Sequence, residues 1–140
     1  MITSRKEAVI MGILKKNKRK VLKSMAAMNM NHEQFQKMME EGTAVLVDFW
    51  APWCSYCRRI APAYEKIAAQ YGDGLVVAKV NIDEEPQLAK KEMIEVIPTL
   101  VMYRNGKAVA SIVAPESKAM IDSFIQEAFA KGGNGHEADL

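Results

Sequence analysis

The sequence predicts an α/β domain in which a central mixed β-sheet is flanked by helices on both faces. Apolar runs of strand length alternate with longer segments whose apolar residues recur at helical spacing. Between two strand patterns near the C-terminus stand Asn105 and Gly106, the strongest short-range indication of an antiparallel hairpin. The chain has 140 residues, of which 49% are hydrophobic and 26% charged, and this composition suits one globular domain of ordinary size.

Positive charge is concentrated ahead of this domain. Residues 1–30 hold eight Lys or Arg against one acidic residue, Glu7, which gives a net charge of +7. Because the whole chain carries +2, residues 31–140 carry −5. We therefore expect a basic N-terminal extension (1–30), one domain (31–131) and a flexible, Gly-rich C-terminal tail (132–140). Since the positive charge lies outside the segment that can build a core, we expect no binding to nucleic acid.

The extension has several interpretations. A disordered basic tail, or upstream sequence translated from a misassigned start, comes first, and a basic helix on a membrane surface stays open. A secretory signal is disfavoured, because the apolar run 8–14 is short and a basic cluster at 15–23 occupies the place of the cleavage region. No run approaches the roughly 18 apolar residues that a membrane span needs. We expect a cytoplasmic monomer without a membrane span.

The first half of the domain predicts a helix, a strand and a second helix. Asn31 is a suitable cap for a helix at about 32–41, with Gln34 three residues further on and Gly42 at its end. Residues 45–50 form an apolar run interrupted by one carboxylate, as expected of a strand buried on both faces. The segment after Cys54 has an apolar helical face, an expected kink at Pro62 and closing glycines; that face comprises Ile60, Tyr64, Ile67, Ala68 and Tyr71.

The second half predicts a strand at 75–80, a short helix that begins near Pro86, and hairpin strands at 99–104 and 107–113. Ser117 is a suitable cap for a last helix. The apolar stripe expected for that helix comprises Met120, Ile121, Phe124, Ile125, Ala128 and Phe129.

The two Cys residues of the chain, Cys54 and Cys57, stand at the junction of a buried strand and the following helix. At the helix N-terminus, unpaired backbone N–H groups and the positive end of the helix dipole favour a thiolate, so we expect Cys54 to be the nucleophile. Cys57 lies one turn further in, where it can attack a mixed disulfide on Cys54, and we expect it to be the resolving thiol. The redox-active pair would need no other cofactor and no metal.

Three other uses of the pair are possible. A zinc site would need two more ligands, and the two histidines, His32 and His136, lie at the edge of the domain and in the tail. A structural disulfide over so short a loop would constrain little of the unfolded chain. A cluster of iron and sulfur bridging two protomers is the third possibility.

Asp48 is the carboxylate inside the apolar strand at 45–50, where a charge is costly unless it is paired or protonated. We hypothesise that Asp48 has a raised pKa and exchanges a proton with Cys57. The alternative is a carboxylate neutralised by Lys79 in the adjacent strand, and the two roles can coexist.

These motifs resemble the thioredoxin family over about residues 31–130. The matching runs are Val47-Asp48-Phe49-Trp50-Ala51-Pro52-Trp53-Cys54, Cys57-Arg58-Arg59-Ile60-Ala61-Pro62, Ala78-Lys79-Val80-Asn81-Ile82-Asp83, Ile97-Pro98-Thr99-Leu100 and Asn105-Gly106. The resemblance implies the thioredoxin fold, protein disulfides as substrates and recycling by an electron donor similar to thioredoxin reductase. It also implies a cis Pro98 that faces the Cys pair, and a shallow apolar substrate groove formed by Trp53, Ile82, Ile97, Pro98 and Val113.

The sequence departs from the family at several positions. Ser55 and Tyr56 replace the usual Gly-Pro between the cysteines, which changes the rigidity of the first helical turn and suggests a more oxidising pair. Both would border the substrate, although Tyr56 could also be a solvent-facing aromatic with no role. Val96 and Ala114 stand where relatives often have Gly, and their side chains would narrow the groove. The first strand of the family has only a weak counterpart in residues 25–30.

The function expected from these residues is that of a protein-disulfide reductase, an electron carrier in cell redox homeostasis. A more oxidising disulfide oxidase or isomerase is the second hypothesis, favoured by the missing Pro. A subunit that uses the groove for docking, independently of redox chemistry, is the third.

Overall fold

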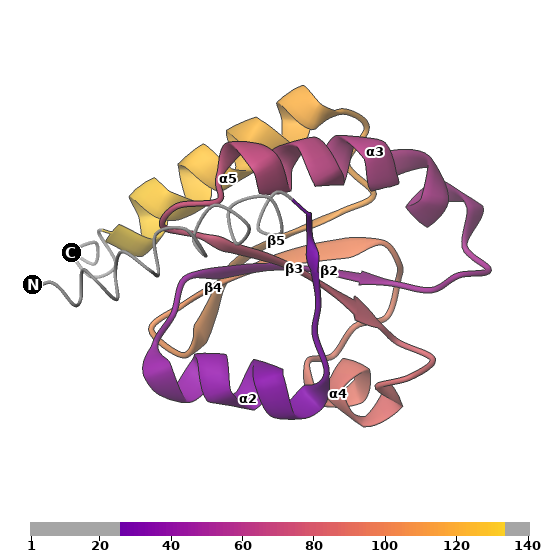
Figure 1. The fold of residues 1–140 in the computed structure, drawn as a ribbon, viewed down its shortest axis with the longest axis horizontal. Helices are drawn as coiled ribbons and strands as arrows, with labels where there is room; N and C mark the ends of the chain where they lie inside the picture. The colour runs from indigo at the N-terminus through magenta and orange to yellow at the C-terminus, as the bar shows by residue number, and fades with distance from the viewer. Residues whose placement is uncertain (1–25, 134–140) are drawn as a thin grey trace, which may run out of the picture.

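The computed structural model describes residues 26–133 and confirms the predicted fold class. Its single five-stranded sheet consists of β1 (Met28–Asn29), β2 (Val45–Trp50), β3 (Val76–Asn81), β4 (Thr99–Arg104) and β5 (Lys107–Val113). The strands follow the spatial order β1-β3-β2-β4-β5 (Figure 1). Since β3 is parallel to β1 and β2, while β4 is antiparallel to β2 and β5, the sheet is mixed, as predicted.

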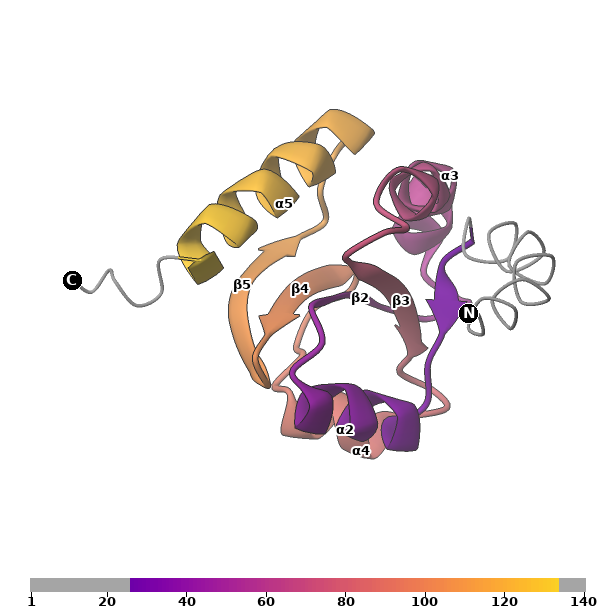
Figure 2. The same ribbon diagram turned by 60° about the vertical axis from the view of Figure 1, so that its left-hand side comes forward.

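Within residues 26–133, four helices cover the sheet: α2 (His32–Glu41), α3 (Ser55–Gln70), α4 (Pro86–Lys91) and α5 (Lys118–Gly133). Helices α3 and α5 lie over one face, and α2 and α4 lie over the other (Figures 1 and 2). Because side chains alternate along a strand, β2 contributes to a separate core on each face. Leu46 packs in the core under α3 and α5, and Val47 packs in the core under α2 and α4.

The helix ends follow the predicted local chemistry. Asn31 and Gln34 form a capping box at the start of α2, and Gly42 ends that helix in the left-handed conformation with φ 72°. Pro62 lies inside α3, as predicted. The Ser117 hydroxyl accepts a hydrogen bond from the Met120 N–H at 3.1 Å at the start of α5.

The hairpin between β4 and β5 also has the predicted form. Asn105 and Gly106 both have positive φ, 53° and 79°, as a two-residue turn matched to the twist of the strands requires. A Cβ on Gly106 would lie 3.1 Å from the Met39 carbonyl oxygen in α2, so the turn packs closely against that helix.

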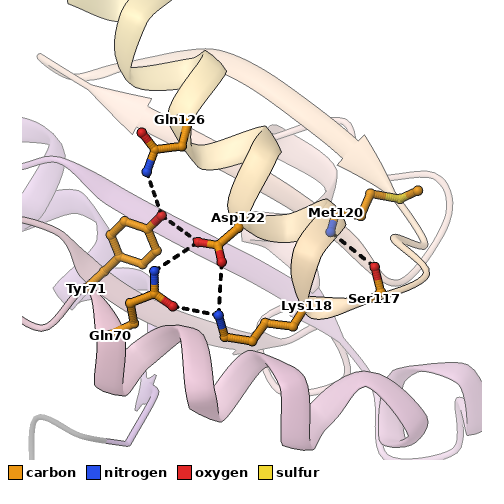
Figure 3. Close-up of polar contacts among 7 residues, drawn as sticks. All are labelled: Gln70, Tyr71, Ser117, Lys118, Met120, Asp122 and Gln126. Atoms are coloured by element: carbon orange, nitrogen blue, oxygen red, sulfur yellow. Dashed lines mark hydrogen bonds and ion pairs between the residues drawn. The ribbon is translucent and has the colours of Figure 1, made fainter.

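A polar cluster joins the end of α3 to α5 (Figure 3). The Asp122 carboxylate accepts hydrogen bonds from the Tyr71 hydroxyl at 2.6 Å, from the Lys118 ammonium at 2.9 Å and from the Gln70 amide at 3.1 Å. The Gln126 amide donates to the Tyr71 hydroxyl at 2.8 Å. We call these five residues the α3–α5 cluster.

Some element boundaries differ from the predictions. The weak segment at 25–30 contains β1, whose Met28 and Asn29 pair with Ala78 and Lys79, so the sheet includes residues that we assigned to the extension. Strand β3 begins and ends one residue later than predicted. Helix α5 runs to Gly133, two residues past the predicted domain end.

In the predicted stripe of α5, Ile121, Ile125 and Ala128 are buried, but Met120 is 40% exposed. The Met120 side chain instead covers the start of its own helix, where its sulfur lies 3.4 Å from the Glu116 N–H. The predicted apolar stripe therefore included one residue, Met120, that does not belong to the buried face of α5.

The rest of the extension (1–25) and of the tail (134–140) lies outside the described residues, so the interpretations of these segments stay predictions. Among residues 26–133, no helix is both long enough and apolar enough to cross a membrane.

Candidate active site

The Cys pair lies at the start of α3, directly after β2 and its connecting turn. Cys54 and Cys57 form a disulfide, with their Cα atoms 5.2 Å apart. Cys54 is the N-cap residue of the helix, and its Sγ accepts a hydrogen bond from the Cys57 N–H at 3.1 Å. In the reduced protein this N–H and the positive helix end would stabilise a thiolate at Cys54, as the sequence predicts.

The two sulfurs differ in how accessible their residues are. Cys54 is 9% exposed, whereas Cys57 is 3% exposed and sits one turn inside the helix. Cys54 is therefore the more accessible residue of the pair.

Trp53, beside Cys54, is 66% exposed and is tied to the loop after β3. Its indole N–H lies 3.1 Å from Asp83 Oδ2, and the adjacent Ile82 N–H donates to the Trp50 carbonyl at 2.9 Å. The side chain of Ile82 is half-buried. Asp83 was not among the predicted site residues, because no local pattern connects it with a tryptophan 30 residues earlier.

A second contact joins the helix of the Cys pair to the loops on its other side. The Tyr56 hydroxyl donates to the Pro115 carbonyl at 3.0 Å, and the neighbouring Ala114 N–H donates to the Pro98 carbonyl at 2.8 Å. The Ile97–Pro98 peptide bond is cis, as the resemblance implies. Tyr56 is therefore not a free solvent-facing aromatic, and its hydroxyl joins the first turn of α3 to the segment that follows β5.

Ala114 has a φ of 45°, in the left-handed region where Gly is favoured. An alanine in this left-handed conformation costs roughly 1–2 kcal/mol more than a glycine, because its Cβ is crowded by the backbone. The departure from Gly at this position therefore has an energetic cost.

The predicted groove residues differ in exposure. Trp53 and Val113 are 66% and 52% exposed, Ile97 is half-buried, and Pro98 is buried. Val113 also borders a hollow of about 300 Å³ together with Val96, Thr99 and Met93. This hollow lies over the β4–β5 face that α2 and α4 share, because its strand residues Val101 and Tyr103 belong to that core.

Asp48 is 2% exposed, and its Oδ1 has no hydrogen-bond partner among the described residues. Burial raises the pKa of this carboxyl from 3.8 to about 7, and the positive charge of Lys79 opposes that rise. Since side chains alternate along β2, Asp48 faces the same side as Leu46, the side that α3 covers. Its charge also helps raise the pKa of the buried Tyr64, after burial itself.

Lys79 pairs with Asp48 in the register of β2 and β3. Its ammonium group lies 4.6 Å from the centre of the Trp50 ring. The side chain also borders a polar hollow of about 390 Å³, together with Asn81, Glu84 and Glu85. The structure therefore brings Asp48 and Lys79 side by side and gives the lysine access to solvent.

Ser55 is exposed at the first position of α3. Among residues 26–133, no group of three or more His, Cys, Asp and Glu side chains is arranged to hold a metal ion.

Comparisons with known proteins show which family the chain resembles. Residues 26–127 match the model of the thioredoxin family. The chain is 44% identical over 92 residues to "Thioredoxin 1" of Synechococcus elongatus, covering 66% of this chain and 86% of that protein. It is 46% identical over 88 residues to "Thioredoxin" of Acidithiobacillus ferridurans, covering 63% and 82%.

An organellar protein and a solved structure are also similar. "Thioredoxin M-type, chloroplastic" of Chlamydomonas reinhardtii is 40% identical over 98 residues, covering 69% of this chain and 70% of that protein. The solved structure is that of a mutant thioredoxin from Halobacterium salinarum, with a TM-score of 0.67 and 25% identity over 75% of this chain and 92% of that one. The chain belongs to the thioredoxin family and is a thiol-disulfide oxidoreductase.

Proposed function

We propose that the protein reduces disulfides in other proteins, with Cys54 as the nucleophile and Cys57 as the resolving thiol. The observation that carries this proposal is the position of Cys54: its sulfur caps a helix, and Cys54 is the more exposed residue of the pair. A thiolate at such a position is both stabilised and reachable.

The first step joins the two proteins. The Cys54 thiolate attacks one sulfur of the substrate disulfide, forms a mixed disulfide, and releases the other sulfur as a thiolate that takes a proton from water. In the second step the Cys57 thiol gives its proton to the Asp48 carboxylate and attacks the Cys54 sulfur. The Cys54–Cys57 disulfide forms, the second substrate thiolate leaves, and two electrons have passed to the substrate.

The surrounding residues support these steps by position. Lys79 lies beside Asp48, and its positive charge would favour the ionised carboxylate that accepts the proton of Cys57. The cis Pro98 and the exposed Trp53 and Val113 would hold the substrate chain. Ser55, Tyr56, Ile82 and Ile97 would complete this contact surface.

The oxidised protein has to be reduced again before the next turnover. We propose a reductase similar to thioredoxin reductase as the electron donor, with the Cys pair as the redox group and no further cofactor. Because this supply of electrons is found in reducing compartments, we place the protein in the cytoplasm, with an organelle such as the chloroplast as the alternative suggested by the Chlamydomonas relative. We propose that it works as a monomer, which light scattering at the mass of 15.6 kDa would test.

Three measurements test the reductase. The wild type should reduce insulin, Cys54→Ser should be inactive, and Cys57→Ser should accumulate a mixed disulfide that mass spectrometry detects. A reduction potential for the pair below about −230 mV supports a reductase, whereas a value above about −180 mV would assign the protein to isomerases or oxidases instead. If the double Cys→Ser variant kept the biological role, docking rather than redox chemistry would be the function.

A further inference from the structure

Two arginines, Arg58 and Arg59, directly follow Cys57 in α3. Both side chains are exposed. We call this pair the arginine rim.

Each guanidinium of the arginine rim is held by a neutral group. Arg58 Nη1 donates to the Pro52 carbonyl at 2.8 Å, which fixes it beside the turn that leads into Trp53 and Cys54. The Arg59 guanidinium lies 5.4 Å from the centre of the Tyr56 ring, in the range of a cation–π contact. Tyr56 is in turn held by the Pro115 carbonyl. Both cations are therefore held against residues that flank the Cys pair in sequence, Pro52 before it and Tyr56 within it, before any partner arrives.

Neither guanidinium is neutralised by the described part of the chain. The one ion pair among residues 26–133 joins Lys118 and Asp122, away from the rim. Glu116, which follows Pro115, makes no ion pair with Arg59, and Asp83 is engaged by the Trp53 indole. The guanidinium groups keep unused N–H donors that suit carboxylate oxygens.

The positive charge of the rim is local. Residues 26–133 contain eleven Lys or Arg and fourteen Asp or Glu, so the described domain is negative as a whole. A generally basic surface would attract any anion, whereas two cations held at residues that flank the Cys pair would act on the part of a partner near its disulfide.

We propose that the arginine rim selects protein disulfides that are flanked by acidic residues. The inference rests on the proposed reductase function and adds a substrate class to it. A carboxylate near the substrate disulfide would meet Arg58 or Arg59 while the disulfide approaches Cys54, which speeds the encounter and fixes the register of the mixed disulfide. A basic residue in the same place would be repelled.

Three synthetic peptides test the proposal. Each carries the same single disulfide, and they differ only in the flanking residues, which are Glu, Gln or Lys. The second-order rate constant for oxidation of the reduced protein by each peptide is measured under single-turnover conditions at low salt. We expect the wild type to react about fivefold faster with the Glu peptide than with the Gln peptide, and slowest with the Lys peptide. The differences between the three rate constants should become smaller as salt is added, because salt screens exposed charges.

The double variant Arg58→Gln/Arg59→Gln should bring the ratio between the Glu and Lys peptides below about twofold. Lys66→Gln is the matched control, because it removes one exposed cation from the same helix, two turns further from the cysteines. It should keep the wild-type ratio. Using ratios cancels any effect that the arginines have on the reactivity of Cys54 toward all peptides alike.

If the wild-type protein reacted equally fast with all three peptides, the proposed selection by the arginine rim would be wrong. The same would follow if the double variant kept the wild-type ratio between the Glu and Lys peptides. Neither result would contradict the proposed reductase function. If the reduced protein were oxidised by none of the peptides, the proposed function would fail and the inference with it.

Discussion

Asp48 is a costly residue for the fold, and we propose that the same burial makes it useful for the reaction. Its carboxyl group is almost completely buried, has an oxygen without a hydrogen-bond partner among the described residues and has a pKa of about 7. Near neutral pH it is therefore present in both protonation states, which a group that accepts and returns a proton requires. The positive charge of the neighbouring Lys79 lowers the pKa, but its effect is smaller than that of burial.

Asp48→Asn should slow the second step of the exchange. The carboxylate accepts the proton of Cys57 only when it is ionised, so in the wild type the decay of a mixed disulfide should accelerate as pH rises through about 7. We expect the Asn variant to lose this inflection and to be about tenfold slower at a pH of about 7.5. Rapid quenching of a preformed mixed disulfide between about pH 5 and 9 measures the rate. An identical profile in both proteins would remove Asp48 from the reaction.

At the scale of secondary structure elements, the close contacts between neighbours should be sensitive to single atoms. Gly106→Ala places a Cβ 3.1 Å from the Met39 carbonyl oxygen and forces alanine to a φ of 79°. Gly74→Ala is the matched control, because its φ of 92° is similarly unfavourable but nothing lies within 4 Å of the new Cβ. We expect a loss of about 2 kcal/mol in the free energy of unfolding for Gly106→Ala and about 1 kcal/mol for Gly74→Ala, measured with urea. Equal losses would mean that the hairpin does not press on α2.

The α3–α5 cluster should contribute to stability in a pH-dependent way. Hydrogen bonds from Tyr71 and Lys118 lower the pKa of Asp122. A lowered pKa in the folded protein stabilises it above the ordinary value of 3.8, and this contribution disappears as pH falls through the folded value. Because the cluster is largely exposed, Asp122→Asn should cost less than about 1 kcal/mol at neutral pH. The difference from the wild type should vanish toward a pH of about 2.

Urea titrations at neutral and at acidic pH provide this comparison. Glu127→Gln, an exposed carboxylate in the same helix, controls for the loss of a negative charge. A deficit of Asp122→Asn that is the same at both pH values would show that shape, rather than charge, links the two helices.

At the scale of the whole molecule, Asp48 should make the protein less stable as pH rises from acid to neutral. Its folded pKa is raised, so its contribution is fully present below the unfolded value of 3.8 and is lost as pH rises through about 7. The difference between these two pKa values corresponds to about 4 kcal/mol at most. We therefore expect Asp48→Asn to match the wild type near pH 4 and to exceed its free energy of unfolding by a few kcal/mol at a pH of about 8.

Asp73→Asn, an exposed carboxylate in the loop before β3, should show no such gain. If Asp48→Asn were no more stable than the wild type at the alkaline end of this range, the carboxyl group would not be under the strain that its burial indicates.

Most of the fold could be predicted from the sequence because its elements are encoded by local patterns. The capping box of α2, the buried run of β2 and the Asn105-Gly106 turn each depend on residues within a few positions of one another. The two-residue β1 could not be placed this way, because it is a strand only through its pairing with β3.

The same distinction explains the site. Cys54, Cys57 and Asp48 could be proposed from local sequence, since a helix start and a buried strand can be recognised within one segment. The hydrogen bonds from Trp53 to Asp83 and from Tyr56 to Pro115 join residues 30 and 59 positions apart. No local sequence pattern predicts these contacts. The cis bond at Pro98 was implied by the family resemblance alone.

The slight exposure of Cys54 has a consequence for which partners are chosen. Because little of Cys54 is exposed, a substrate must present a disulfide that protrudes from its own surface. Disulfides inside a rigid, well-packed core cannot reach Cys54, whereas disulfides in flexible loops or in a partly unfolded chain can. The enzyme would thus respond to the looseness of a protein as well as to its sequence.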